Sequence, residues 1–172
     1  MLSIPEIKRF IDDDITSEKK RLAAVGQRYY EAEHDILQYR LFYYNSDGNL
    51  VEDTTRSNMK IPHPFFTELV DQTVQYMLSG KDVNGELKLM KSDIPALQRR
   101  LDEYFDDDFY SELSEVLTGT VSKGFDYMHT YTNSEGRLAF QHADSMGVVE
   151  VRAKDTDDGC EYVIFWYVDR IA

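Results

Sequence analysis

The sequence predicts an α+β fold in which N-terminal helices pack on a mostly antiparallel β-sheet. Several runs within residues 1–124 repeat apolar side chains at helical spacing, with capping and turn residues at the ends of most runs. Residues 125–168 instead alternate apolar and polar side chains between glycine-containing turns, which is typical of hairpins. We therefore expect an N-terminal helical segment at residues 1–38 and an α+β domain at residues 39–172.

A first helix is predicted at the start of the chain. Ser3 and Glu6 have the spacing of a capping box, in which each side chain can satisfy a free amide of the first turn. Pro5 is tolerated in that turn, and the helix ends near Asp14. Its apolar stripe consists of Ile4, Ile7, Phe10 and Ile11.

A second helix begins at Thr16 or Ser17, either of which can cap it. Apolar residues at helical spacing extend it to Ile36, and Gly26 lowers its stability slightly. A basic cluster, Lys19–Arg21, lies in its first turn. The stripe consists of Leu22, Val25, Tyr29, Ala32 and Ile36.

An aromatic hairpin is predicted after the second helix. Residues 39–44 are dense in tyrosine and phenylalanine, and residues 45–48 read Asn-Ser-Asp-Gly. Gly48 suits the left-handed backbone that such a turn needs. Residues 52–60 are polar and show neither helical nor strand spacing of apolar residues, so we expect a loop there.

The helix with the widest apolar face follows His63. Pro64 suits its first position, and Gly80 lies just past its end, where a glycine favours termination. Its apolar face consists of Phe65, Phe66, Leu69, Val70, Val74, Met77 and Leu78. Residues 83–91 are then predicted to form a short strand.

Two more helices precede the predicted sheet. Ser92 caps the first of them, and Asp106–Asp108 separates it from the second, which ends by Gly124. The first stripe consists of Leu97, Leu101, Tyr104 and Phe105, and the second of Phe109, Leu113, Val116, Leu117 and Val121.

The C-terminal residues predict three or more strands. Residues 125–131 and 138–140 alternate on either side of the turn at residues 133–136. A strand at residues 148–151 is followed by a turn at residues 155–159, and the run YVIFWYV closes the described pattern at Val168. Because an apolar strand needs cover on both faces, we expect this chain to be a piece of a longer protein.

Size and composition predict a folded chain. At 20.1 kDa the chain should bury about 70% of its unfolded surface, by the usual scaling of surface area with mass. Cys160 is the sole cysteine, which excludes an internal disulfide and a cysteine-based zinc site. The N-terminal residues lack a signal-peptide pattern, and no run has the roughly 20 apolar residues of a membrane span.

The net charge of −13 is unevenly distributed. Residues 1–60 carry 9 Lys and Arg against 11 Asp and Glu, whereas residues 61–172 carry 10 against 21. Such an acidic chain repels nucleic-acid backbones, so we expect weak direct binding to DNA.

Three stretches resemble phage portal proteins of the long-tailed phage type. They are YYEAEHDIL at residues 29–37, SNMKIPHPFF at residues 57–66 with the helix that follows, and VSKGFDY at residues 121–127 with the acidic hairpin and DSMGV at residues 144–148. The family has a similar Tyr pair with His-Asp-Ile, a similar Asn-x-Lys-Ile segment before a helix, and a similar strand, acidic hairpin and Asp-Pro segment. The chain departs from that pattern at Pro64, Phe125 and Ser145.

The resemblance implies a structural subunit, and no enzyme. Portal subunits form a homo-oligomeric ring at one capsid vertex, through which DNA is packaged and ejected. By resemblance, the partners are terminase, head-completion proteins and capsid or scaffold proteins, and the location is the virion, with assembly in the bacterial host cytoplasm. This chain would be the outer wing, which makes inter-subunit contacts.

Two other hypotheses stay open from the residues alone. One is a small cytoplasmic acidic module that binds a protein partner. The other is a metal-dependent hydrolase using His129, His142 and Asp144, which hairpin pairing could bring together. The acidic runs at residues 12–14 and 106–108 are interpreted as solvated helix ends, because consecutive helical side chains diverge.

We assign no residue to catalysis, to a cofactor or to a metal. One inter-subunit contact is predicted, in which Lys19, Lys20 and Arg21 meet acidic residues from 61–172 of the next subunit. Opposite charges at a head-to-tail contact would set the register of the ring.

Overall fold

The computed structural model describes residues 2–80, 90–152 and 159–168. The short strand predicted at residues 83–91 falls almost wholly outside this part of the chain, and so does most of the turn predicted at residues 155–159.

The described residues form helices and antiparallel strand pairs, which confirms the α+β class. The helices are α1 (Ile4–Ile15), α2 (Glu18–Tyr30), α3 (Phe65–Met77), α4 (Pro95–Tyr104) and α5 (Asp107–Lys123), with short 3-10 turns η1 (Asp35–Gln38) and η2 (Ser145–Gly147). The strands are β1 (Phe42–Tyr44), β2 (Leu50–Glu52), β3 (Tyr127–Thr132), β4 (Leu138–Ala143), β5 (Val148–Arg152) and β6 (Cys160–Phe165). The division of the chain after residue 38 stays a prediction.

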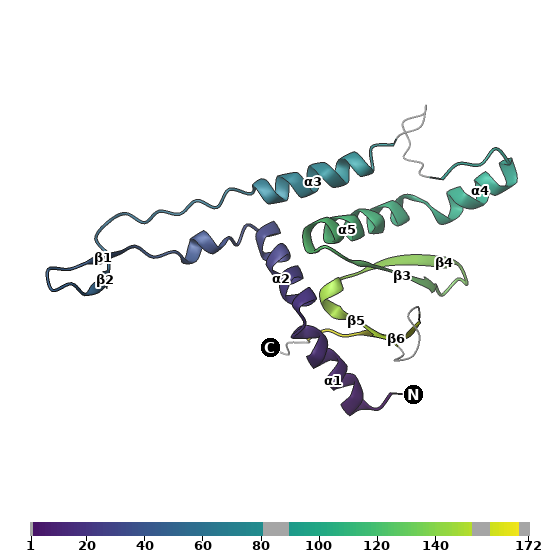
Figure 1. Ribbon diagram of the computed structural model, residues 1–172. Helices are drawn as coiled ribbons and strands as arrows, with labels where there is room; N and C mark the ends of the chain where they lie inside the picture. Colours follow the sequence, from purple (N-terminus) through teal and green to yellow (C-terminus); the bar gives the residue numbers. More distant parts are fainter. Residues whose placement is uncertain (1, 81–89, 153–158, 169–172) are drawn as a thin grey trace.

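The molecule is elongated. Helix α5 lies centrally, between α3 on one side and the β3–β4 and β5–β6 hairpins on the other (Figure 1). The segment that carries β1 and β2 projects from the body as a long arm, while α4 and the turn of the β3–β4 hairpin lie at the opposite end (Figure 1). We call residues 39–64 the arm.

The strands do not form the single sheet expected over residues 125–168. Among the described residues, β1–β2, β3–β4 and β5–β6 are three separate two-stranded antiparallel sheets. The chain turns at η2 between β4 and β5, where Asp144 accepts a hydrogen bond from the Met146 amide at 2.9 Å. This turn redirects the backbone, so each hairpin pairs only within itself.

The two predicted Asn-x-x-Gly turns are confirmed, and they use the same chemistry. Asn45 accepts hydrogen bonds from two backbone amides of its own turn, at 3.0 and 2.9 Å, and Asn133 does the same at 3.0 and 2.9 Å. Gly48 and Gly136 adopt φ values of 77° and 76°, a left-handed backbone that glycine tolerates without strain. Both hairpins are therefore fixed by local sequence.

The capping box predicted at the start of α1 is also present. The Glu6 carboxylate accepts from the Ser3 amide at 2.9 Å and from its hydroxyl at 2.6 Å. These hydrogen bonds lower the pKa of Glu6 below its ordinary value.

The predicted extent and stripe of the second helix are wrong. Helix α2 ends at Tyr30, because Ala32 takes a φ of 60° and the Glu33 amide donates to the Arg28 carbonyl at 2.8 Å, which is a Schellman ending. Leu22, from the predicted stripe, is 55% exposed. The buried face instead carries Lys20, Ala23 and Gly26.

Gly26 lets α2 approach α5 closely. A Cβ atom at this position would overlap the Ser122 carbonyl of α5, which is backbone and cannot move aside. The glycine is therefore a packing requirement of the α2–α5 crossing, and its effect on helix propensity is secondary.

We expect Gly26→Ala to lower the free energy of unfolding by roughly 1–3 kcal/mol, the usual effect of overpacking. Helix propensity alone predicts the opposite result, because alanine in place of glycine should raise the free energy of unfolding by roughly 1 kcal/mol. Ala24→Gly, at an exposed site of the same helix, is the matched control for propensity. Denaturation followed by circular dichroism measures both, and a stabilised Gly26→Ala protein would contradict the close crossing.

The described core is small for a chain of this size. The buried apolar side chains are Ala23, Val70, Val74, Val148, Val149 and Val151. The chain exposes 13304 Å², about 1.5 times the roughly 8,700 Å² of a compact protein of this mass. It buries about 54% of its unfolded surface, so the expectation of about 70% is wrong.

Candidate functional site

The basic cluster predicted as an inter-subunit contact contains one buried lysine. Lys20 is 3% exposed, and its ammonium group donates to the Ser145 carbonyl and, at 2.8 Å, to the Val148 carbonyl. It also pairs with Asp14 at 3.0 Å. Lys20 therefore anchors α2 to the start of β5 and is not available to a neighbouring subunit.

The two neighbours of Lys20 lie at the surface. The Lys19 ammonium sits 3.7 Å from the ring centroid of Phe125, a cation–π contact, and the Arg21 guanidinium lies 3.6 Å from the Glu18 carboxylate. Both side chains keep exposed surface that another chain could contact.

The cluster proposed for a metal-dependent hydrolase does not assemble. In the β3–β4 register His142 lies opposite Met128, whereas His129 lies opposite Gln141. Opposite residues share a face and adjacent residues alternate, so the two histidines point to opposite faces. The His129 ring packs on Tyr131 and Phe165, with centroids 5.7 and 5.0 Å away.

His142 and Asp144 belong to a structural network instead. The Asp126 side chain is fully buried and accepts from the Ser145 amide at 2.6 Å and from the Lys123 ammonium at 3.0 Å. His142 Nε2 lies 2.9 Å from the same carboxylate. Lys123 also pairs with Asp144 at 2.6 Å. We call these residues, Lys123, Asp126, His142 and Asp144, the polar junction.

The polar junction joins the end of α5 to the turn between β4 and β5. Burial raises the pKa of Asp144, but hydrogen bonds from Lys123 and from the Met146 amide outweigh it and hold the pKa below the ordinary value. Each charged group in the polar junction faces a partner of opposite charge or a hydrogen-bond partner. The junction therefore holds the end of α5 against the turn between β4 and β5.

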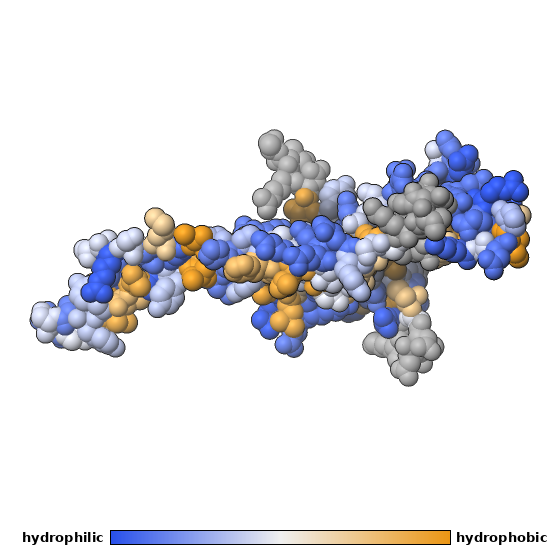
Figure 2. Space-filling view, turned by 90° about the horizontal axis from the view of Figure 1, so that it is seen from above, coloured by the Kyte–Doolittle hydropathy of each residue, from blue (hydrophilic) through white to orange (hydrophobic). Residues whose placement is uncertain are grey.

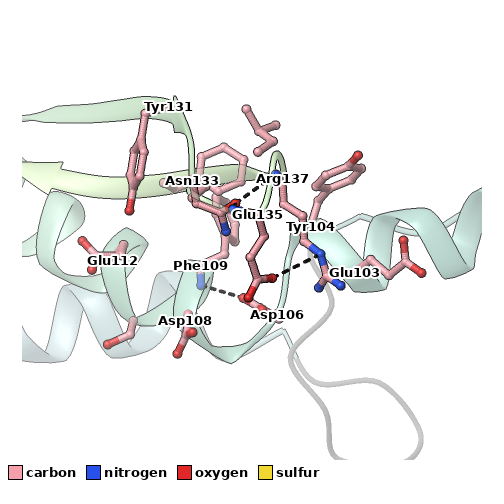
Figure 3. Close-up of a pocket in the computed structure, with 14 residues that line it drawn as sticks. Glu103, Tyr104, Asp106, Asp108, Phe109, Glu112, Tyr131, Asn133, Glu135 and Arg137 are labelled. Carbon is pink, nitrogen blue, oxygen red and sulfur yellow. Dashed lines mark hydrogen bonds and ion pairs between the residues drawn. The ribbon is translucent and has the colours of Figure 1, made fainter.

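A groove lies at the end of the molecule opposite the arm. It has a volume of about 600 Å³ and lies between the α4–α5 connection and the turn of the β3–β4 hairpin (Figure 3). Aromatic side chains form its floor, where the Phe109 and Phe140 rings are 4.8 Å apart. Its rim is acidic, with Glu103, Asp106, Asp108, Glu112 and Glu135 around Arg137.

Polar side chains of the groove make local contacts. Asp106 caps α5 by accepting from the Phe109 amide at 3.0 Å, and Glu135 lies 3.7 Å from Arg137 (Figure 3). The acidic rim repels phosphates and nucleic acid. Within residues 2–80, 90–152 and 159–168, no three His, Cys, Asp or Glu side chains are placed to share a metal ion.

Large apolar side chains are exposed over the arm and the start of α3 (Figure 2). In β1 and β2 every residue is exposed. Sequence reasoning predicted an aromatic hairpin here but did not predict that its side chains are exposed. The sequence does contain an indication of this surface, because residues 39–44 place several aromatic side chains beside the short polar turn at residues 45–48.

An elongated α+β chain with a small core and exposed apolar side chains is typical of a subunit that other molecules cover in an assembly. The sequence matches the family described as "Phage portal protein, SPP1 Gp6-like" over residues 8–171, so this chain belongs to the phage portal protein family. The resemblance predicted from three stretches is thereby confirmed.

A curated relative agrees with this family. The portal protein of Bacillus phage SPP1 is 33% identical to the chain over 115 residues. The match covers 67% of this chain and 22% of that protein, so the chain corresponds to a minor part of the relative's length. Membership in this family does not favour the acidic binding module or the hydrolase.

None of the helices in the described part of the chain combines the length and the apolar composition that crossing a membrane requires.

Proposed function

We propose that this chain is part of a structural subunit of a phage portal ring, at the capsid vertex through which DNA is packaged and ejected. The observation that carries this proposal is the exposed surface, about 1.5 times that of a compact protein of the same mass. A chain that leaves so much surface uncovered is suited to an assembly, and its family supplies the kind of assembly.

Within that ring, this chain supplies outer wing contacts between subunits and with the shell. Its partners are further copies of the full-length subunit, together with terminase, head-completion proteins and capsid or scaffold proteins. It works in the virion after assembly in the host cytoplasm. Its role is architectural, and a net charge of −13 keeps its own contact with DNA weak.

Electron microscopy of the full-length protein tests the proposed function. We expect closed rings with a central hole that hold many copies of the chain. A full-length protein that stays monomeric at micromolar concentration, in the presence of its capsid partners, would contradict it.

We propose that Lys19 and Arg21 meet acidic residues of the adjacent subunit, without Lys20, which is used inside the chain. Reversing both charges, Lys19→Glu with Arg21→Glu, should lower ring yield several-fold, on the order of 1 kcal/mol per subunit contact. Lys8→Glu, an exposed charge reversal on α1, is the matched control. Thermal denaturation checks that the variant folds, and a folded variant with normal ring yield would refute the contact.

A further inference from the structure

We draw no further inference here: the strongest candidate, the groove between the α4–α5 connection and the turn of the β3–β4 hairpin, joins an acidic rim to an aromatic floor, but nothing in the structure shows what covers it.

Discussion

Replacing Lys20 with methionine is expected to lower the free energy of unfolding by roughly 3–5 kcal/mol, the usual effect of removing one partner of a buried ion pair. Methionine keeps most of the volume but cannot donate to the Ser145 and Val148 carbonyls. It also leaves Asp14 without the ammonium group that lies 3.0 Å away. Urea denaturation followed by tryptophan fluorescence is a suitable measurement, because Trp166 follows β6, which pairs with β5.

The neighbouring residues supply the control for Lys20. Arg21→Met removes a charge of the same sign from the next position, at an exposed site, and should change stability by no more than about 0.5 kcal/mol. If the two variants were equally stable, Lys20 would be a solvated residue like Arg21, and the anchoring of α2 to β5 would be wrong.

Replacing Asp126 with alanine is also expected to lower the free energy of unfolding by roughly 3–5 kcal/mol. This carboxylate is fully buried, and its loss leaves the Ser145 amide without its acceptor and the buried Lys123 with Asp144 as its remaining carboxylate. Asp47→Ala, in the exposed turn of the arm, removes a carboxylate of the same kind and should leave stability nearly unchanged.

A double variant distinguishes a buried charge pair from simple loss of packing. If the cost of Asp126→Ala comes from removing one of the two carboxylates that pair with the buried Lys123, then Lys123→Met in the same protein should restore part of the stability. Additive losses in the double variant would show that the two residues act independently. Calorimetric or urea unfolding of the four proteins of this cycle gives the coupling free energy directly.

Local sequence predicted the turns, the caps of α1, α2 and the end of α5, and the class of the fold, whereas the predicted Ser92 cap is wrong, because Ile94 holds the N-cap position of α4. The Asn45 and Asn133 turns follow from side chains that bond their own backbone, so a few consecutive residues contain all the information. The end of α5 at Gly124, which has a φ of 88°, follows equally from a glycine in the C-cap position.

Features that depend on distant partners were not predictable in this way. Lys20 belongs to a run of basic residues, which is usually solvated, and its carbonyl partners are 125 and 128 residues away. The buried face of α2 is likewise chosen by the crossing with α5 and not by the hydrophobic period of α2 itself. The placement of His129 and His142 depended on hairpin register, in which one residue of offset changes the face.

The Lys20 contact also constrains the order in which the chain can fold during its synthesis on the ribosome. Helices α1 and α2 emerge early, whereas the carbonyl groups that receive the lysine belong to residues made 125 positions later. At typical translation rates of about 5–20 residues per second, Lys20 waits roughly 6–25 seconds before its carbonyl acceptors have been made, although α2 can cross α5 earlier. Because contacts of high sequence separation form slowly, the Lys20 contact is expected to be among the last to form. Premature termination before residue 145 would therefore release a chain in which Lys20 lacks both carbonyl acceptors.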